Sequence, residues 1–152
     1  MFDVQHPPFL PWSPVPGAPD FTERSLAETL DGGQAFRWNH ADGAFEGRWA
    51  RELVRLRLHK GQLEVAAPAG SSPLPALRRY LALDTDFAAL TDALPWRNDP
   101  VLKTAVDAFP GLRILRQPFG ETLFGFLCSS TKQILQIKAI CEAVAADLGD
   151  PL

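Results

Sequence analysis

Alternation of apolar and basic residues between Val54 and Leu58 constrains the fold of this chain more than any other feature. A period of two residues is the pattern of a strand with one buried and one solvent-exposed face. Lys60-Gly61 then turns the chain into a second short segment, Gln62-Leu63-Glu64-Val65. Similar patterning begins earlier, so the stretch from Phe36 to Ala67 predicts an antiparallel meander with one face in water.

Helical spacing replaces this alternation after the loop Gly70-Ser71-Ser72-Pro73. Apolar residues at helical intervals predict two short helices, and Asp84 or Thr85 is expected to cap the second. Asn98-Asp99-Pro100 offers a cap followed by proline at the first helical position, so a third helix should run to about Phe109. Two more helices are predicted, roughly Glu121 to Cys128 and Gln133 to Leu148.

Six prolines crowd the first twenty residues. Proline fixes φ and removes a backbone donor, so we expect an extended, partly polyproline arm, with Phe9, Leu10 and Trp12 able to pin it onto the sheet. A shift in composition near Gly111 suggests a domain boundary. The predicted organisation is therefore an arm over 1–20, an α+β domain over 21–111 and a helical segment over 112–152.

Composition fits an ordinary globular protein, with 46% hydrophobic and 22% charged residues. No apolar run approaches the roughly 20 residues of a membrane span, and residues 1–8 lack the pattern of a signal peptide. Two cysteines are too few for a disulfide framework and have no metal-ligand spacing. We therefore expect an intracellular monomer that binds no metal, cofactor or membrane.

A net charge of −3 argues mildly against a nucleic-acid partner. Phosphate contacts depend on local charge, however, and the basic residues are clustered. One cluster, between Arg48 and Lys60, is equally compatible with a solvated strand face. The other comprises Arg113, Arg116, Lys132 and Lys138.

Two short motifs carry the functional information. The first is Gly33-Gln34-Ala35-Phe36-Arg37-Trp38, in which Phe36 and Trp38 alternate with Arg37 and should share one sheet face as core aromatics. The second is Phe124-Gly125-Phe126-Leu127-Cys128-Ser129-Ser130, which places aromatics and a thiol on a helix that ends in paired hydroxyls. Phe124, Phe126, Leu127 and Cys128 are expected to pack where the sheet domain meets the helical domain.

Together, in this order and at this separation, the two motifs resemble the 8-oxoguanine DNA glycosylase family of base-excision repair enzymes. The resemblance runs from about Ser25 to about Leu148. It implies an α+β fold, a twisted antiparallel sheet with packed helices similar to the TATA-binding protein. The start of an all-α helix-hairpin-helix glycosylase domain should follow this sheet.

The resemblance assigns base recognition to Gly33, with Phe126 and Cys128 near the base pocket. Guanine N7 is a hydrogen-bond acceptor, whereas N7 of 8-oxoguanine carries a proton. A carbonyl at this glycine would accept a hydrogen bond from that N7–H but face a lone pair on undamaged guanine, a mismatch of about 1–3 kcal/mol. The alternative is that Gly32-Gly33 only makes a turn before a strand. No histidine lies near Cys128, so a catalytic thiol is not expected.

The same resemblance places the loop after the second motif in the DNA minor groove, where it would fill the gap left by a flipped base. Hydroxyls and a lysine before a helix can also bind phosphate, and a plain helix cap is the alternative. In this chain Thr131, Lys132 and Gln133 replace three asparagines of the family, and Gln136 stands where an arginine reads the orphaned cytosine. The DNA-binding residues implied are Ser129, Ser130, Thr131, Lys132, Gln133 and Gln136.

The lysine nucleophile and the assisting aspartate of this family have no counterparts here. Lys60, Lys103, Lys132 and Lys138 all lack the Gly-rich hairpin that accompanies the nucleophile. The last helix has nothing to bury against, so we expect a truncated fragment that is inactive by itself. Its parent would excise oxidised purines from damaged duplex DNA. The alternatives are a non-catalytic module that binds DNA or protein, and a glycosylase for alkylated bases.

Overall fold

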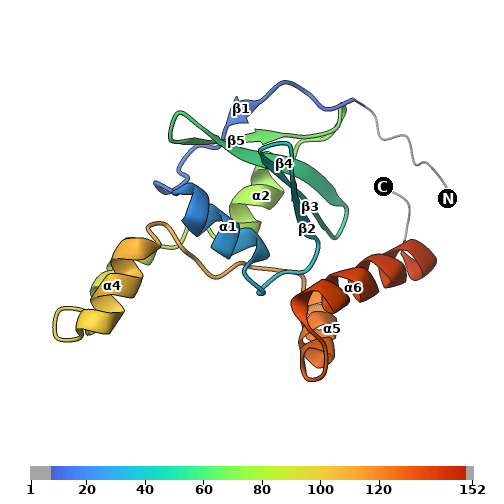
Figure 1. Ribbon diagram of the computed structural model, residues 1–152. Helices are drawn as coiled ribbons and strands as arrows, with labels where there is room; N and C mark the ends of the chain where they lie inside the picture. The colour runs from blue at the N-terminus through green and yellow to red at the C-terminus, as the bar shows by residue number, and fades with distance from the viewer. Residues whose placement is uncertain (1–7, 150–152) are drawn as a thin grey trace.

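The computed structural model describes residues 8–149 and shows an α+β fold, as predicted (Figure 1). A five-stranded sheet carries helices on one face, and further helices extend from both ends of this body. In chain order the elements are β1 (Ser13–Pro14), α1 (Glu23–Asp31), β2 (Trp38–Ala41), β3 (Ala44–Trp49), β4 (Glu52–His59), β5 (Gln62–Ala66), α2 (Leu74–Tyr80), α3 (Phe87–Asp92), α4 (Pro100–Ala108), α5 (Phe119–Ser129) and α6 (Ile134–Leu148).

The sheet has the order β1-β5-β4-β3-β2, and every neighbouring pair is antiparallel. The predicted meander is therefore confirmed. Two of its turns contain two residues with positive φ, Asp42-Gly43 and Lys60-Gly61, as tight hairpins require. Val54 and Leu56 are buried while Arg55 between them is exposed, which is the alternation that predicted the strand.

The Pro-rich arm packs on the sheet and adds an edge strand to it. Ser13 of β1 pairs with Val65, and the Leu10 amide donates to the carbonyl of Ala67 at 2.8 Å. Phe9 and Trp12 lie beneath the guanidinium groups of Arg55 and Arg57, each 4.3 Å from a ring centroid. Pinning of the arm is thus confirmed for Phe9 and Trp12, whereas the Leu10 side chain is exposed and only its backbone bonds the sheet. Residues 1–7 lie outside the described part of the chain.

Helix α1 was not among the elements predicted from the sequence. Thr22 and Ser25 form a reciprocal cap at its start, and Leu26 and Leu30 are fully buried one turn apart. Together with Leu77 of α2, these leucines build the core on the inner face of the sheet (Figure 1). A hydroxyl cap followed by leucines at i and i+4 is the signal that could have identified α1.

Trp38 is central to this core, but Phe36 is not its neighbour on the sheet. Strand β2 begins only at Trp38, whose indole is fully buried and stacks 5.9 Å from Trp49. Phe36 precedes the strand and lies against Gly125 of α5 instead. The expectation that both aromatics share one face of the sheet is therefore wrong, because the strand starts two residues later than the alternation suggested.

Caps define the two outer helices. Asp99 accepts hydrogen bonds from the Val101 and Leu102 amides, so α4 begins at Pro100 as predicted. Helix α3 is capped by Asp86, not by Asp84 or Thr85. The guanidinium of Arg116, in the extended connector that leads to α5, instead donates hydrogen bonds to the side chains of Asp84 and Thr85. That tertiary contact removes both residues from capping.

Helices α5 and α6 form a hairpin at the end of the body opposite α4 (Figure 1). Phe124 is half-buried, but Phe126 is 70% and Leu127 62% exposed. The expectation that these two residues pack against the sheet domain is therefore wrong. Both lie on a face of α5 turned away from the sheet, because Gly125, between Phe124 and Phe126, is the position that meets Phe36.

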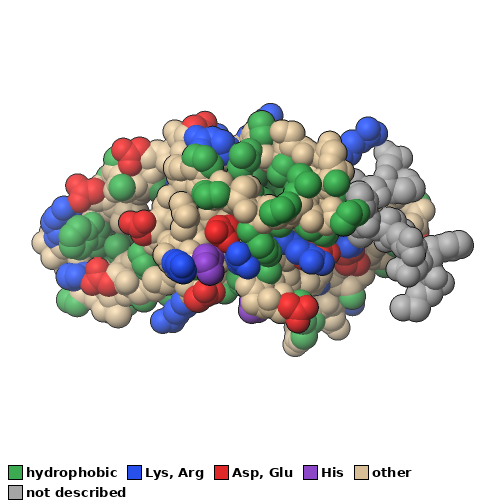
Figure 2. All heavy atoms as spheres, turned by 90° about the horizontal axis from the view of Figure 1, so that it is seen from above, with side chains coloured by type: hydrophobic (Ala, Val, Ile, Leu, Met, Phe, Trp, Pro, Cys, Tyr) green, Lys and Arg blue, Asp and Glu red, His purple; other side chains and the backbone are tan. Residues whose placement is uncertain are grey.

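The face of the molecule seen in Figure 2 mixes acidic and basic side chains among the described residues. Arg55 and Arg48 both pair with Glu46, and Arg57 pairs with Glu64. The first basic cluster thus belongs to a paired strand face. In the second, Arg113 is 6% exposed and Arg116 pairs with Asp84, so neither offers a free cation to a phosphate.

Candidate nucleic-acid interface

The loop after α1 and the loop between α5 and α6 share one cavity of about 620 Å³. The two loops are about one hundred residues apart in sequence. The first contributes Gly33 and the second Ser129, Lys132 and Gln133. Gly32, Phe36, Ile134, Leu135 and Ile137 complete the lining. The structure therefore brings together the glycine and the loop that the sequence singled out.

Gly33 has a backbone conformation that only glycine adopts easily, with φ of +103°. A Cβ placed there would lie 3.2 Å from Cδ1 of Ile134, the first residue of α6. No residue within 8–149 donates a hydrogen bond to the Gly33 carbonyl, so its oxygen is available as an acceptor. The requirement for glycine is thus established, and its part in base recognition stays a prediction.

Gln34 fixes the loop that carries Gly33. Its side-chain nitrogen donates to the carbonyls of Thr29 and Arg113, both at 3.0 Å, and its side-chain oxygen accepts from the Leu115 amide at 3.0 Å. Its own carbonyl accepts from the side chain of Gln117. Sequence reasoning had given Gln34 no role, although an amide that can donate and accept at once is suited to joining backbone segments.

The hydroxyls of Ser129 and Ser130 are occupied within α5. They donate to the carbonyls of Phe126 and Leu127, at 2.7 and 2.9 Å, and so close the end of the helix. These hydrogen bonds are typical of the C-terminal turn of a helix and not of a preformed phosphate-binding site. Contacts of either serine with DNA remain a prediction.

Gln133 and Gln136 cap α6 in a reciprocal manner. The backbone N–H of Gln133 donates to Oε1 of Gln136 at 3.0 Å, and the backbone N–H of Gln136 donates to the main-chain carbonyl of Gln133 at 2.9 Å. The helix-cap alternative therefore describes these two glutamines correctly in this structure. A role of Gln136 opposite an extruded base would require this cap to open.

The remaining site residues are placed as follows. Thr131 and Lys132 are exposed at the tip of the loop, and Lys132 forms no ion pair with any residue that the structure describes. Phe126 and Cys128 do not line the shared cavity: Phe126 points to solvent and Cys128 is half-buried in the α5–α6 hairpin. Their assignment to the base pocket stays a prediction.

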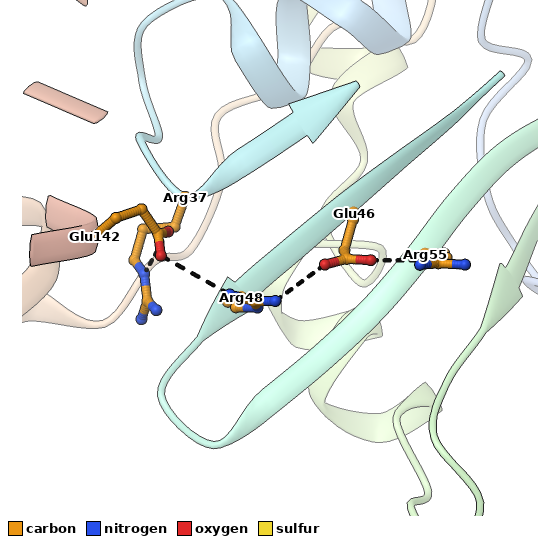
Figure 3. Close-up of polar contacts among 5 residues, drawn as sticks. All are labelled: Arg37, Glu46, Arg48, Arg55 and Glu142. Atoms are coloured by element: carbon orange, nitrogen blue, oxygen red, sulfur yellow. Dashed lines mark hydrogen bonds and ion pairs between the residues drawn. The ribbon is translucent and has the colours of Figure 1, made fainter. Parts of the chain in front are cut away.

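Two ion pairs tie α6 to the segment around Gly33. Nζ of Lys138 lies 2.7 Å from Oδ1 of Asp31, and Oε1 of Glu142 lies 3.2 Å from Nε of Arg37. Glu142 also approaches Arg48 at 3.8 Å (Figure 3). Sequence reasoning could not find the Lys138–Asp31 and Arg37–Glu142 pairs, because their residues are 107 and 105 positions apart.

A second cavity of about 440 Å³ lies where the sheet meets α5 and α6. Arg37, Arg48 and Cys141 are among its lining residues. Burial raises the pKa of the Cys141 thiol, with Cys128 as a further contributor, so Cys141 is a poor nucleophile at neutral pH. Across residues 8–149 no cluster of metal-binding side chains occurs, and no helix is long and apolar enough to cross a membrane.

Comparison with known proteins identifies the family of this chain. Residues 19–123 match the model of the 8-oxoguanine DNA glycosylase N-terminal domain. The chain belongs to this family. The expectation drawn from the two motifs is therefore confirmed, and the matched region contains Gly33, Gln34 and the first residues of α5.

The glycosylase relatives are longer than this chain. It is 31% identical over 137 residues to the N-glycosylase/DNA lyase OGG1 of Arabidopsis thaliana, covering 85% of this chain and 38% of the relative. An N-glycosylase/DNA lyase of Saccharomyces cerevisiae is 28% identical with the same coverage. The chain thus spans about two fifths of the curated relatives that it matches.

Solved glycosylase structures share the fold. A structure of MBOgg1 in complex with a low-affinity DNA ligand matches at a TM-score of 0.75 and 32% identity, covering 90% of this chain and 46% of that one. A Clostridium acetobutylicum 8-oxoguanine glycosylase/lyase, bound to duplex DNA with cytosine opposite 8-oxoguanine, matches at 0.73 and 26%, covering 84% and 43%. Most of this chain thus has a counterpart of the same fold in these structures.

Proposed function

We propose that the full-length polypeptide containing this chain excises 8-oxoguanine from damaged duplex DNA after flipping the base out of the helix. The observation that carries this proposal is the cavity shared by Gly33 and the loop of Ser129, Lys132 and Gln133. An enzyme that acts on a base must hold the extruded base and also occupy the gap it leaves. One cavity with these two walls supplies both functions.

Lesion recognition follows from the Gly33 carbonyl. Its oxygen receives no hydrogen bond from a described residue and lies in a loop held rigid by Gln34. Protonated N7 of 8-oxoguanine donates to such an oxygen, whereas N7 of guanine presents a lone pair to it. The resulting penalty of about 1–3 kcal/mol for guanine corresponds to roughly five- to 150-fold discrimination.

DNA is the proposed partner, and relatives described as DNA complexes support it. Most arginines near the interface already pair with carboxylates, so Lys132 is the cation best placed to neutralise a phosphate. Backbone amides and the capping glutamines would add neutral contacts. Binding should therefore depend on salt with the shallow slope of a few phosphate contacts.

The 152-residue chain alone is proposed to lack excision activity. Lys138 and Lys103 are paired with Asp31 and Asp107, and Lys60 and Lys132 are exposed side chains. The matched relatives have further residues to supply a nucleophile. We propose that the full-length protein works as an intracellular monomer on duplex DNA, with the present chain contributing part of its base pocket.

Borohydride trapping of the full-length polypeptide on an 8-oxoguanine duplex tests this function. A Schiff base between a lysine and the sugar should give a covalent adduct that the matched guanine duplex does not give. Absence of both an adduct and free 8-oxoguanine, with the lesion opposite any of the four bases, would contradict the proposal. Excision of alkylated purines instead would reassign the substrate, and binding without excision would favour a non-catalytic module.

A further inference from the structure

Three residues on one face of α6 pack against or pair with the loop that carries Gly33. Ile134, Lys138 and Glu142 are spaced by four positions, so their side chains lie in one row along the helix. Ile134 lies where it would meet a Cβ on Gly33, at 3.2 Å, while Lys138 and Glu142 form ion pairs at either end of the loop over residues 32–36. One face of α6 therefore meets this loop at three points: at its start, at Gly33 and at its end.

The two ion pairs have opposite polarity. Lys138 of α6 meets Asp31, the last residue of α1, and Glu142 of α6 meets Arg37, which precedes β2. A slip of α6 by one helical turn, about 5.4 Å, would bring Glu142 to Asp31 or Lys138 to Arg37. Either slip juxtaposes like charges, so the pairs select one register of α6 against the loop.

Local helix stability does not explain these charges. Asp31 lies in the last turn of α1, where the partial negative charge of the helix C-terminus disfavours a carboxylate. Lys138 and Arg37 are only 16% and 19% exposed, so each cation has given up much of its hydration. Loss of either partner would therefore leave a poorly solvated charge at the edge of the loop.

We propose that Lys138 and Glu142 are positioning residues whose ion pairs with Asp31 and Arg37 fix the loop over residues 32–36 against α6 and so set the width of the lesion pocket. This inference rests on the proposed glycosylase function. Neither residue lines the cavity. They act through the distance between Gly33 and the loop of Ser129, Lys132 and Gln133, both of which line it.

The test uses four variants of the full-length polypeptide: Lys138→Met, Glu142→Gln, the charge swap Asp31→Lys with Lys138→Asp, and the control Glu64→Gln. The control breaks the Arg57–Glu64 pair, which is similarly buried and joins β4 to β5 away from the cavity. Single-turnover excision from an 8-oxoguanine·cytosine duplex and affinity for the undamaged duplex are measured for each. Amide exchange of residues 32–36 is followed in parallel.

Each of the two α6 variants should lower the excision rate about tenfold, within the range of coupling measured for interacting residues, while affinity for undamaged DNA stays unchanged. The charge swap should restore the rate to within about threefold, because the same two groups meet again. The control should excise at the native rate. Unchanged rates in Lys138→Met and Glu142→Gln, or a swap that restores nothing, would overturn the inference.

Amide exchange separates this inference from the proposed function. If the native protein excises no base, the glycosylase proposal fails, but amide exchange still reports whether the two ion pairs hold the loop over residues 32–36. Faster exchange of these residues in the two α6 variants, reversed by the swap, would then support the ion pairs as a feature of the fold that holds this loop. Exchange equal to that of the native protein in both variants would overturn it.

Discussion

The side-chain amide of Gln34 donates to the carbonyl of Arg113 across 79 residues of sequence and accepts from the amide of Leu115. This one side chain joins the loop after α1 to the connector that leads into α5. The connector leads into α5, and the loop after α5 lines the shared cavity. The side-chain amide of Gln34 therefore links the Gly33 loop to this second loop through the backbone of the connector and α5.

Replacement of Gln34 by leucine should lower the free energy of unfolding by about 2–4 kcal/mol. The substitution leaves the Leu115 amide and the carbonyls of Thr29 and Arg113 without a partner, and each such loss costs about 1 kcal/mol or more. Urea denaturation of the full-length polypeptide measures it. The control is Gln62→Leu at an exposed strand end, which should change stability little, and equal effects at both positions would contradict this assignment.

Two glycines of α5 should respond oppositely to alanine. A Cβ at Gly125 would lie 2.6 Å from the ring of Phe36, so Gly125→Ala must displace that ring and should destabilise by about 1–3 kcal/mol. Nothing lies within 4 Å of a Cβ at Gly120, where alanine should stabilise the helix by up to about 1 kcal/mol. Thermal melts of the two variants give the sign directly, and stabilisation by Gly125→Ala would show that Phe36 does not pack there.

Tyr80, the single tyrosine of the chain, should titrate unusually late. Its hydroxyl accepts from Nε1 of Trp38 at 3.0 Å, and burial raises its pKa to about 12. Since the unfolded value is about 10, the stabilisation from the neutral phenol is complete below about pH 10 and is lost as pH rises towards 12. In a polypeptide limited to these 152 residues, the ultraviolet absorbance of tyrosinate should appear near pH 12 while the fold persists.

Tyr80→Phe is the matched variant for that titration. It should abolish the absorbance change and lower the free energy of unfolding by about 1 kcal/mol, because the buried indole N–H of Trp38 loses its acceptor. A tyrosine that titrates near pH 10 in the folded protein would contradict the burial of this hydroxyl.

Gly33→Ala should impair lesion recognition more than folding. Alanine at φ of +103° is strained by about 1–2 kcal/mol, and its Cβ would press on Ile134 inside the cavity. Gly43→Ala is the control, because Gly43 also has positive φ but open space around it. Excision of 8-oxoguanine by the full-length polypeptide should fall at least about tenfold for Gly33→Ala alone. Equal rates for the two variants would remove Gly33 from the pocket.

Local patterns in the sequence were sufficient for the meander, the start of α4 and the positions of α5 and α6. Each depends on interactions within a few residues: period-two alternation around Val54, positive φ at Lys60-Gly61, and capping by Asp99. The motif around Gly33 also identified the family from sequence. Such features are encoded where they occur, so they could be read without knowledge of the rest of the chain.

Only the tertiary structure decided how these pieces form a site. Asp84 pairs with Arg116 and does not cap a helix, and Phe36 packs against Gly125 and not on the sheet face. Phe126 is exposed to solvent. The grip of Lys138 and Glu142 on the Gly33 loop was likewise invisible in sequence. These contacts join residues about 30 to 107 positions apart, and their free energy depends on burial and on the geometry of both partners, neither of which a local pattern contains.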